Sequence, residues 1–425
     1  MSATSLRIAA VSLHTSPLEA PGGADAGGMN VVVLEQSLAL AQRGHQVDLF
    51  TRRTDPTAPS VVEIAEGVRL FHLDAGPASP LAKSDMDQTI TPFRAALREA
   101  LTTSRAPGRP ANSDANDAPV ATGWDLIHSH HWFSGVAALP LARELGIPHL
   151  QSFHSVAAPE GSSTLDAGEP AESTGRIPGE QFVATGSDLV VAVSEAEART
   201  IGERYGVPGS RLTVVRPGVD VDRFHPCSDL TARRERPTLL FTARLQPLKG
   251  PDLALEILAH LNPELGARLV LAGGTSQDFA DYAEQLRTLA RDLGIEDRVD
   301  FVGSLDRDQL AETMRCAGAL LLTSWSETFG LVALEAQASG TPVIAWRFAG
   351  GVQEAVDPAG LVLDSRDPDV WAEALQFLLW DADGYRDAVG SAREFAATRT
   401  WEATAQTLES QYARLFAGRA AEELR

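Results

Sequence analysis

Short apolar runs alternate with amphipathic helical patterns along most of this chain, and this alternation restricts the fold more than any other feature. Parallel strands need a crossover connection, which a helix supplies, so the pattern predicts parallel sheets flanked by helices. The expected strands of the first half are Arg7–Leu13, Gln46–Thr51, Val68–Leu73, Leu126–His128, His149–Phe153, Leu189–Val193 and Leu212–Val215. Those of the second half are Thr238–Thr242, Arg268–Leu271, Val299–Val302, Ala319–Thr323 and Pro342–Trp346. The clearest helices are expected at Met29–Arg43, Asp252–Leu261, Asp278–Leu293, Asp308–Ala317 and Trp401–Phe416.

The length of the chain sets the number of domains. With 425 residues, the chain is too long for a single hydrophobic core. A stretch rich in proline and charge, from Arg216 to Pro237, separates two similar halves. We therefore predict an α/β protein with two Rossmann-like domains, over residues 1–217 and 218–400, and a final helix within 401–425 that packs back on the first domain. Ligands of such sheets bind outside the carboxyl ends of the strands, so the site is expected in a cleft between the domains.

Composition limits the partners and the compartment. The formal net charge of -21 argues against nucleic acid, which needs basic patches. The cysteines, Cys227 and Cys316, have no disulfide or zinc spacing, and the N-terminus lacks the apolar region of a signal peptide. We therefore expect a cytoplasmic protein. Two stretches lack periodicity: Thr102–Gly123 is expected to be disordered, and Ala157–Gly179 to be an irregular lid or acceptor loop.

The segment from Ser326 to Glu335 carries the strongest chemical signal. Glu327 is expected on the loop at the end of an apolar strand, and Glu335 inside the helix that follows. Between them, Phe329-Gly330-Leu331 should open that helix, whose first N–H groups suit a phosphate. Because carboxylates accept hydrogen bonds from hydroxyls, this order of groups suits a nucleotide sugar: sugar hydroxyls, diphosphate, ribose hydroxyls.

Two glycine-containing loops also follow strands. The first runs from Pro21 to Asn30, and its glycines allow backbone N–H groups to approach a phosphate or sugar. It is neither a GxGxxG nor a Walker sequence, so nothing indicates NAD or ATP hydrolysis. The second, Ala243–Gly250, places Arg244 and Lys249 around a turn, where they suit a diphosphate. The alternatives are a flexible turn and a solvated basic turn.

Histidines gather near two strand ends of the first half. His154 meets a polar serine and the irregular stretch after it, which is unusual for a structural histidine. His128 and His130 share a strand face next to His131, but no neighbouring carboxylate or cysteine completes a metal site. Asp-x-Asp sequences occur at Asp85–Asp87, Asp220–Asp222 and Asp306–Asp308, as expected by chance in so acidic a chain. We therefore expect no metal and no cofactor, with Arg244 and Lys249 in the metal's electrostatic role.

Taken together, the motifs Gly27-Gly28-Met29-Asn30, Arg244–Gly250 and Glu327–Glu335 resemble the family-four retaining glycosyltransferases of the GT-B fold. The resemblance covers nearly the whole chain and implies donor binding in the second domain. It implies that Arg244 and Lys249 grip the donor diphosphate, that Glu327 contacts the donor sugar, and that Glu335 holds the ribose. Further donor contacts are implied for Gly23, Gly28, Phe329, Gly330 and Leu331, and a contact with the reacting sugar for His154.

The first domain would then bind the acceptor. Its motifs resemble the inositol-phosphate glycosyltransferases of the same family. By that resemblance the acceptor residues are Asn30, Lys83, His131, Ser155 and Arg176. His131 occupies a position where those enzymes have tyrosine, and Ser155 one where they have threonine.

The predicted function is retaining transfer of a hexosyl unit from UDP-GlcNAc or UDP-glucose to a small hydroxyl acceptor, with inositol phosphate as one candidate. The expected partners are thus a nucleotide-diphosphate sugar and a small acceptor, and a homodimer is left open. The alternatives are a sugar phosphate, lipid or other small metabolite as acceptor, or GDP-mannose as donor. A sugar-nucleotide-binding protein without turnover and a periplasmic-type binding protein are the rivals from other classes.

Overall fold

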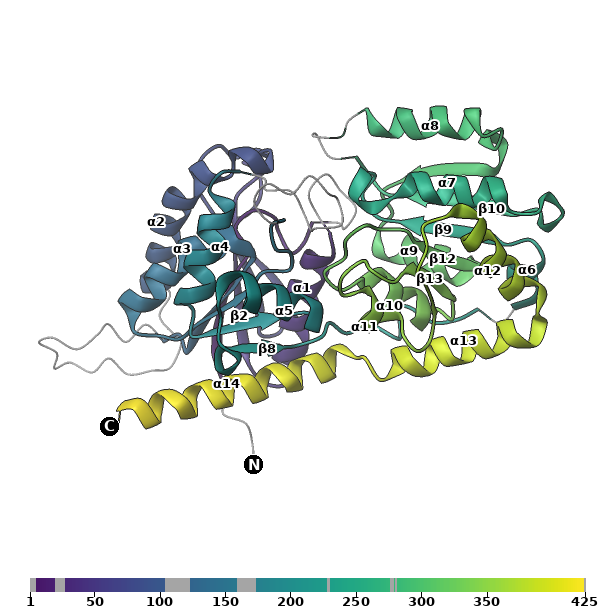
Figure 1. Cartoon of the computed structure of the whole chain (residues 1–425). Coiled ribbons are helices and arrows are strands. Elements are labelled where there is room, and N and C mark those ends of the chain that lie inside the picture. The colour runs from purple at the N-terminus through teal and green to yellow at the C-terminus, as the bar shows by residue number, and fades with distance from the viewer. Residues whose placement is uncertain are drawn as a thin grey trace, which may run out of the picture.

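The computed structural model describes residues 5–19, 27–103, 123–158, 173–227, 230–275, 279 and 281–423. These residues form two α/β domains that face each other, and the last helix runs back from the second domain along the first (Figure 1). Each domain has a central, mostly parallel sheet with helices on both faces, as the alternating sequence pattern predicts.

The first domain is built on an eight-stranded sheet of order β3-β4-β2-β1-β5-β6-β7-β8. Only the β3–β4 pair is antiparallel among the pairs of this sheet in the described residues. The strands are β1 Arg7–Val11, β2 Gln46–Arg52, β3 Val61–Ala65, β4 Val68–Leu73, β5 Leu126–His130, β6 His149–Ser152, β7 Leu189–Ala192 and β8 Leu212–Val214.

Two apolar layers cover this sheet. One face packs against α1 and α14, and the other against the remaining helices of the domain. The helices are α1 Gly28–Gln42, α2 Asp87–Thr103, α3 His131–Leu145, α4 Arg176–Gly186, α5 Glu195–Tyr205 and α14 Trp401–Glu423, with short 3-10 turns η1 Lys83–Asp85 and η3 Gly209–Arg211.

The second domain has a six-stranded sheet of order β11-β10-β9-β12-β13-β14, and its described pairs are parallel. Its strands are β9 Thr238–Thr242, β10 Arg268–Ala272, β11 Val299–Gly303, β12 Ala319–Leu322, β13 Val343–Trp346 and β14 Leu361–Leu363. Its helices are α6 Leu230–Glu235, α7 Pro251–His260, α8 Tyr282–Asp292, α9 Arg307–Cys316, α10 Leu331–Ala338, α11 Val352–Val356, α12 Pro368–Trp380 and α13 Ala382–Ala397, with 3-10 turns η4 Pro247–Lys249, η5 Pro263–Leu265 and η7 Glu296–Arg298. One large apolar cluster joins its layers.

The chain crosses between the domains twice, and the two crossings lie side by side. Val219 forms a parallel bridge with Thr400, and its N–H donates to the Arg399 carbonyl at 2.8 Å. Gly218 is needed there because a Cβ at this position would stand 2.3 Å from the Trp401 nitrogen. The two domains are therefore connected by two adjacent stretches of chain that are hydrogen-bonded to each other.

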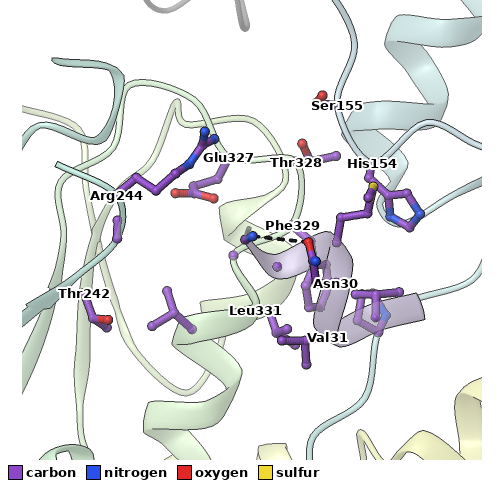
Figure 2. A pocket seen from close by; sticks show the side chains of 18 of the residues that line it. Asn30, Val31, His154, Ser155, Thr242, Arg244, Glu327, Thr328, Phe329 and Leu331 are labelled. Atoms are coloured by element: carbon purple, nitrogen blue, oxygen red, sulfur yellow. Dashed lines mark hydrogen bonds between the residues drawn. The ribbon is translucent and has the colours of Figure 1, made fainter. Parts of the chain in front are cut away.

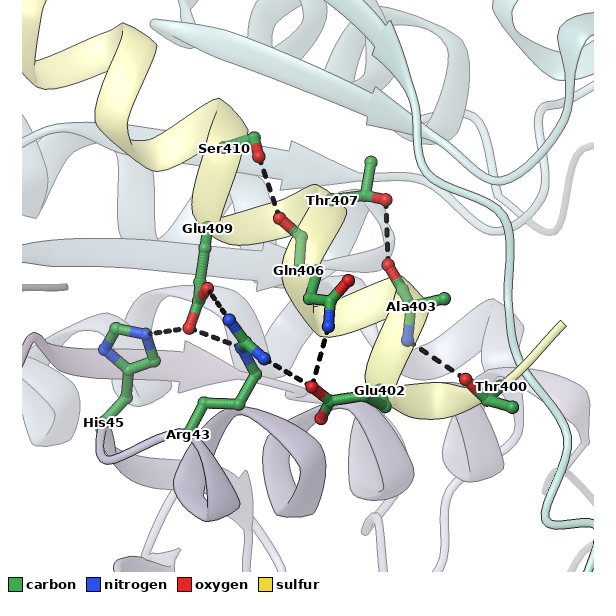
Figure 3. Close-up of polar contacts among 9 residues, drawn as sticks. All are labelled: Arg43, His45, Thr400, Glu402, Ala403, Gln406, Thr407, Glu409 and Ser410. Atoms are coloured by element: carbon green, nitrogen blue, oxygen red, sulfur yellow. Dashed lines mark hydrogen bonds and ion pairs between the residues drawn. The ribbon is translucent and has the colours of Figure 1, made fainter. Parts of the chain in front are cut away.

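After the second crossing, α14 docks on the first domain through apolar and charged contacts. Trp401, Ala405, Leu408 and Tyr412 are buried against the α1 face of the sheet. At the end of α1, Arg43 forms ion pairs with Glu402 and Glu409, and His45 contacts Glu409 at 2.9 Å (Figure 3).

The sequence-based boundaries agree with these elements to within a few residues, with particular exceptions. The sequence pattern placed no element at β3 and β14 or at the helices α2 to α6 and α11 to α13, and it ended the final helix at Phe416, whereas α14 continues to Glu423. The stretch Ala157–Gly179 was expected to be irregular throughout, but α4 begins at Arg176 within it, so that prediction was wrong for its end. The expected disorder of Thr102–Gly123 falls almost wholly outside the described residues. No helix in the described ranges has the length and apolarity required to cross a membrane.

Candidate active site

A cleft lies between the domains, at the carboxyl ends of their central strands. The first domain contributes the loop after β1, the start of α1, η1, and the residues that follow β5 and β6. The second contributes the loops after β9, β10 and β12 and the start of α10. Figure 2 shows the two sets facing each other, with Arg244 and Glu327 on one side and Asn30 and His154 on the other. This is the location that the parallel sheets predicted.

The loop between β12 and α10 brings Glu327 into the cleft. Its backbone forms a bridge with Gly350, in which the Glu327 N–H donates to the Ala349 carbonyl at 3.0 Å. Gly330 then begins α10 with a φ of 92°, a left-handed conformation that favours glycine. Phe329, Gly330 and Leu331 all line the cleft, so the start of α10 opens onto it as predicted.

Glu327 and Lys249 form an ion pair in the cleft. Lys249 Nζ lies 2.8 Å from Glu327 Oε1 and 3.3 Å from the Ser326 carbonyl, and Ser324 Oγ donates to the same Oε1 at 2.7 Å. Both charged side chains are only 14% exposed. An ammonium group has three protons, and two go to these partners, so the third can serve a ligand oxygen. Arg244 lines the cleft beside Glu327 (Figure 2).

Glu335 lies deeper in the same half of the cleft. It is buried in α10, and Arg307 Nη1 donates to its Oε1 at 2.6 Å. Burial raises the pKa of Glu335, and the neighbouring Arg307 charge opposes that rise. Arg307 also lies over the Phe224 ring at 4.8 Å. This role of Arg307 was not predicted, because Arg307 lies inside an Asp-x-Asp sequence. Asp306 in fact caps α9, whose first residue is Arg307.

His154 enters the cleft from the first domain. Its φ of 63° is unusual for a residue with a side chain and aims the loop after β6 toward the cleft. His154 Nε2 lies 2.9 Å from His130 Nδ1, and His130 Nε2 lies 3.3 Å from the Gln36 amide nitrogen. Burial lowers the pKa of His154 to about 3 and that of His130 well below 6.5. His154 is therefore neutral near pH 7 and can contact a hydroxyl without carrying charge.

The predicted acceptor residues divide into two groups. Lys83, His131 and Ser155 line the cleft, and His131 packs its ring 4.2 Å from that of His14. Asn30 also lines the cleft, but its amide is engaged with the first domain, where Nδ2 donates to Thr15 Oγ1 at 2.8 Å.

Arg176 has a different position from the one predicted. It is fully buried, does not line the cleft, and donates to Glu180 Oε1 at 2.8 Å and to Ser155 Oγ at 3.0 Å. In this structure Arg176 supports Ser155 from behind. Gly28 lies at the cleft, where a Cβ on it would stand 4.0 Å from the Leu331 side chain of the other domain. Gly23 lies outside the described residues.

The described residues include no group of three or more His, Cys, Asp or Glu side chains placed to hold a metal ion. His128 and His130 do share a strand face, with ring centroids 4.4 Å apart, but their partners are uncharged. His128 Nε2 bonds Ser152 Oγ at 2.9 Å.

Comparison with known proteins identifies the family of the chain. Residues 26–223 match the family described as Glycosyltransferase Family 4, and residues 228–395 match Glycosyl transferases group 1. The chain is 39% identical over 423 residues to the D-inositol 3-phosphate glycosyltransferase of Xylanimonas cellulosilytica, covering 96% of each chain. It is 38% identical to the protein of the same name from Kineococcus radiotolerans, covering 98% of this chain and 97% of the relative.

The chain belongs to glycosyltransferase family 4.

Solved structures place this family 4 glycosyltransferase in the GT-B fold. Sucrose-phosphate synthase from Thermosynechococcus elongatus superposes with a TM-score of 0.83 at 30% identity, over 97% of this chain and 100% of that one. Anabaena HepE, solved in complex with UDP and glucose, superposes with a TM-score of 0.71 at 18% identity, over 96% of this chain and all of HepE. The second likeness concerns the fold alone.

The geometry of this glycosyltransferase groups its polar residues by domain. Glu327 lies just before α10 and Glu335 within it, and Lys249 and Arg244 lie beside Glu327. This arrangement suits a ligand that has hydroxyls on either side of an anionic centre. The opposite wall holds histidines, a lysine and hydroxyl groups. The sequence assigned no role to Arg307 or Gln36 and offered His130 only as a metal ligand, because their contacts are with residues far away in the chain.

Proposed function

We propose that this glycosyltransferase moves a hexosyl unit, with retention of configuration, from a UDP sugar to a small hydroxyl acceptor. UDP-GlcNAc and UDP-glucose are the proposed donors, and an inositol phosphate is the first acceptor to test. The observation that carries the proposal is the Lys249–Glu327 pair at the start of α10, with Glu335 eight residues further along. Near-full-length identity of 39% to a D-inositol 3-phosphate glycosyltransferase supports the acceptor.

Each donor part has a partner in this arrangement. Glu327 accepts hydrogen bonds from the donor sugar, and Glu335, held by Arg307, accepts them from the ribose. The diphosphate lies at the start of α10, where the helix dipole, Lys249 and Arg244 stabilise the negative charge that grows as the glycosidic bond breaks. His154 contacts a hydroxyl of the reacting sugar. These contacts use fixed charges of the chain, and we expect turnover to persist with EDTA.

Retention is proposed through front-face displacement. Glu327 and Glu335 are the carboxylates among the described residues that line the cleft, and both lie on the donor side. A carboxylate nucleophile would have to attack from the opposite face of the sugar. The departing phosphate oxygen instead takes the proton of the acceptor hydroxyl while that hydroxyl attacks on the same face. The protein contributes position and charge stabilisation.

A sugar phosphate is the second acceptor class, because sucrose-phosphate synthase superposes with a TM-score of 0.83 at 30% identity. The test is UDP release from UDP-GlcNAc and UDP-glucose, with GDP release from GDP-mannose in parallel, each without acceptor, with 1L-inositol 1-phosphate and with fructose 6-phosphate. We expect release to increase at least tenfold with the inositol phosphate. An increase only with fructose 6-phosphate would show that the acceptor is a sugar phosphate instead of an inositol phosphate. No release with any pair would overturn the proposed reaction.

The stereochemistry needs its own measurement. Proton NMR of the product of the active pair should show the axial anomeric linkage of the donor. An equatorial linkage would refute front-face displacement while leaving the donor site intact.

A further inference from the structure

A carboxylate of the second domain completes the start of a helix in the first. The first N–H groups of any α-helix have no acceptor within the helix. In α5, the Glu197 N–H donates to Ser194 Oγ at 3.0 Å, as an N-cap. The N–H groups of Glu195 and Ala196 instead donate to Oε1 of Glu354, at 2.7 and 3.3 Å. Glu354 belongs to α11, so these bonds cross from one domain to the other.

The other oxygen of Glu354 is also bound to the first domain. Arg216 Nε donates to Oε2 at 2.9 Å, just before the chain makes its first crossing. The Glu354 side chain is 19% exposed, so solvent competes little for it. A carboxylate at a helix start, paired with a guanidinium, combines two favourable charge interactions. Both oxygens of one side chain therefore hold the domains together next to the crossing segment.

This contact connects to the backbone of the donor-side loop. The residues just before α11 pair with Glu327, because the Gly351 N–H donates to the Glu327 carbonyl at 2.8 Å. Next along the loop, the Thr328 carbonyl accepts from Ser194 Oγ at 2.6 Å, again across the domains. Packing there is tight: a Cβ on Gly351 would stand 2.1 Å from the Thr328 oxygen and 2.8 Å from Ser194 Oγ.

We propose that Glu354 is a positioning residue for glycosyl transfer, because its contacts with α5 and Arg216 hold the Ser326–Gly330 loop in place across the cleft. Glu354 itself does not line the cleft. It acts through Gly351 and Thr328 on the backbone of Glu327, so that Glu327 is correctly placed when the domains are together. The kinetic part of this role rests on the proposed function; the structural part does not.

Amide hydrogen exchange tests the structural part without any substrate. The Glu195 and Ala196 amides have no acceptor inside α5, so their protection depends on Glu354. Exchange is measured by mass spectrometry on peptides covering Ser194–Ala198 and Ser326–Gly330. In Glu354→Ala we expect the amides of both peptides to exchange at least about fivefold faster. Glu354→Gln keeps an acceptor oxygen, so its increase in exchange rate should be smaller.

Kinetics test the positioning role. The matched control is Glu195→Gln, because Glu195 contacts the same Arg216 at 3.2 Å but lies in the same domain and is 59% exposed. With the active donor and acceptor, Glu354→Ala should lower kcat about tenfold, because the loss of one hydrogen bond to a charged group reduces a rate by about that much. The donor KM should change less than about threefold. Glu354→Gln should lie between, and Glu195→Gln should match wild type.

The exchange and kinetic measurements can each contradict the proposal. Unchanged exchange in both peptides overturns the contact, and a kcat loss equal in Glu195→Gln, or a loss confined to KM, overturns the positioning role. Should Glu354→Ala fail to fold, Glu354→Gln keeps the shape and decides both measurements. If the wild-type protein turns over no donor, the proposed function fails, and the exchange measurement still decides whether Glu354 holds the loop.

Discussion

Replacing Lys249 by alanine tests the donor site most directly. The Lys249 ammonium is anchored by Glu327 at 2.8 Å and the Ser326 carbonyl at 3.3 Å, and is 14% exposed. It follows that the charge is held in one place with little solvent around it. The substitution removes that charge from the point where a leaving diphosphate is proposed to gain negative charge.

The size of the effect follows from the charge and its surroundings. One unit charge about 4 Å from another contributes about 4 kcal/mol at an effective dielectric constant near 20. Water that enters the space left by the side chain solvates the diphosphate and so restores part of this electrostatic stabilisation. A loss of about 3–4 kcal/mol remains, which corresponds to a fall in kcat of about 10²–10³, the range found for loss of a single oxyanion donor.

The assay is UDP release under saturating donor, with a thermal unfolding curve for each variant. Arg268→Ala is the matched control, because Arg268 pairs with Asp300 at 2.9 Å in the same domain, with both side chains 48% exposed. Such surface pairs contribute little, so the control should keep its turnover within about twofold. The double variant Lys249→Ala with Glu327→Gln should lose less than the product of the single losses, because the two side chains are in contact.

A folded Lys249→Ala protein that keeps wild-type turnover would refute this reasoning. A fall of the same size in Arg268→Ala would also refute it, since the loss would then reflect general stability or charge. Additive losses in the double variant would show that Glu327 and Lys249 act independently, contrary to their contact in the structure.

Other predictions follow from the remaining contacts. His154→Ala should lower turnover about 10–10²-fold while UDP binding by calorimetry changes less than about threefold, since one hydrogen bond to the sugar is lost; weakened UDP binding alone would contradict it. Arg307→Met should weaken UDP binding about tenfold, and more at pH 5.5 than at pH 8, because without Arg307 the pKa of buried Glu335 rises further; a loss independent of pH would count against this. Acid should destabilise the fold, because burial lowers the pKa of His128, His149 and His154 from 6.5 to about 3. The unfolded chain then binds more protons between those values, so the unfolding free energy is full above pH 6.5 and falls by about 1.4 kcal/mol per pH unit per histidine below it; urea unfolding midpoints that stay equal at pH 7, 6 and 5 would disprove this.

The chain's local pattern was sufficient for every described strand except β3 and β14, and for the helices α1, α7 to α10 and α14. A buried parallel strand is a short apolar run, and a helix has its own periodicity, so both can be read without knowing their neighbours. The two strands that the pattern missed were missed for a common reason. β3 has alternating exposure at the edge of its sheet and β14 has three residues, so pairing with β4 and β13 defines them more than composition does.

The donor side of the candidate site was also readable locally. Glu327, Gly330 and Glu335 lie within nine residues of one strand–loop–helix unit, and Lys249 lies between β9 and α7 of the same sheet. Strand ends of a parallel sheet meet at one edge, so position in the sequence was enough to bring these residues together.

Tertiary structure decided the contacts between residues that are distant in the chain. Arg176 matched an acceptor motif, yet Glu180 and Ser155 hold it in the interior. Arg307 stood in an apparent Asp-x-Asp sequence, yet it holds Glu335. The Glu354 contact with α5 spans 159 positions. The sequence alone determined the elements, because backbone and burial preferences act over a few residues. The fold alone determined these partners, because a hydrogen bond or ion pair depends on distances that only the packed domains set.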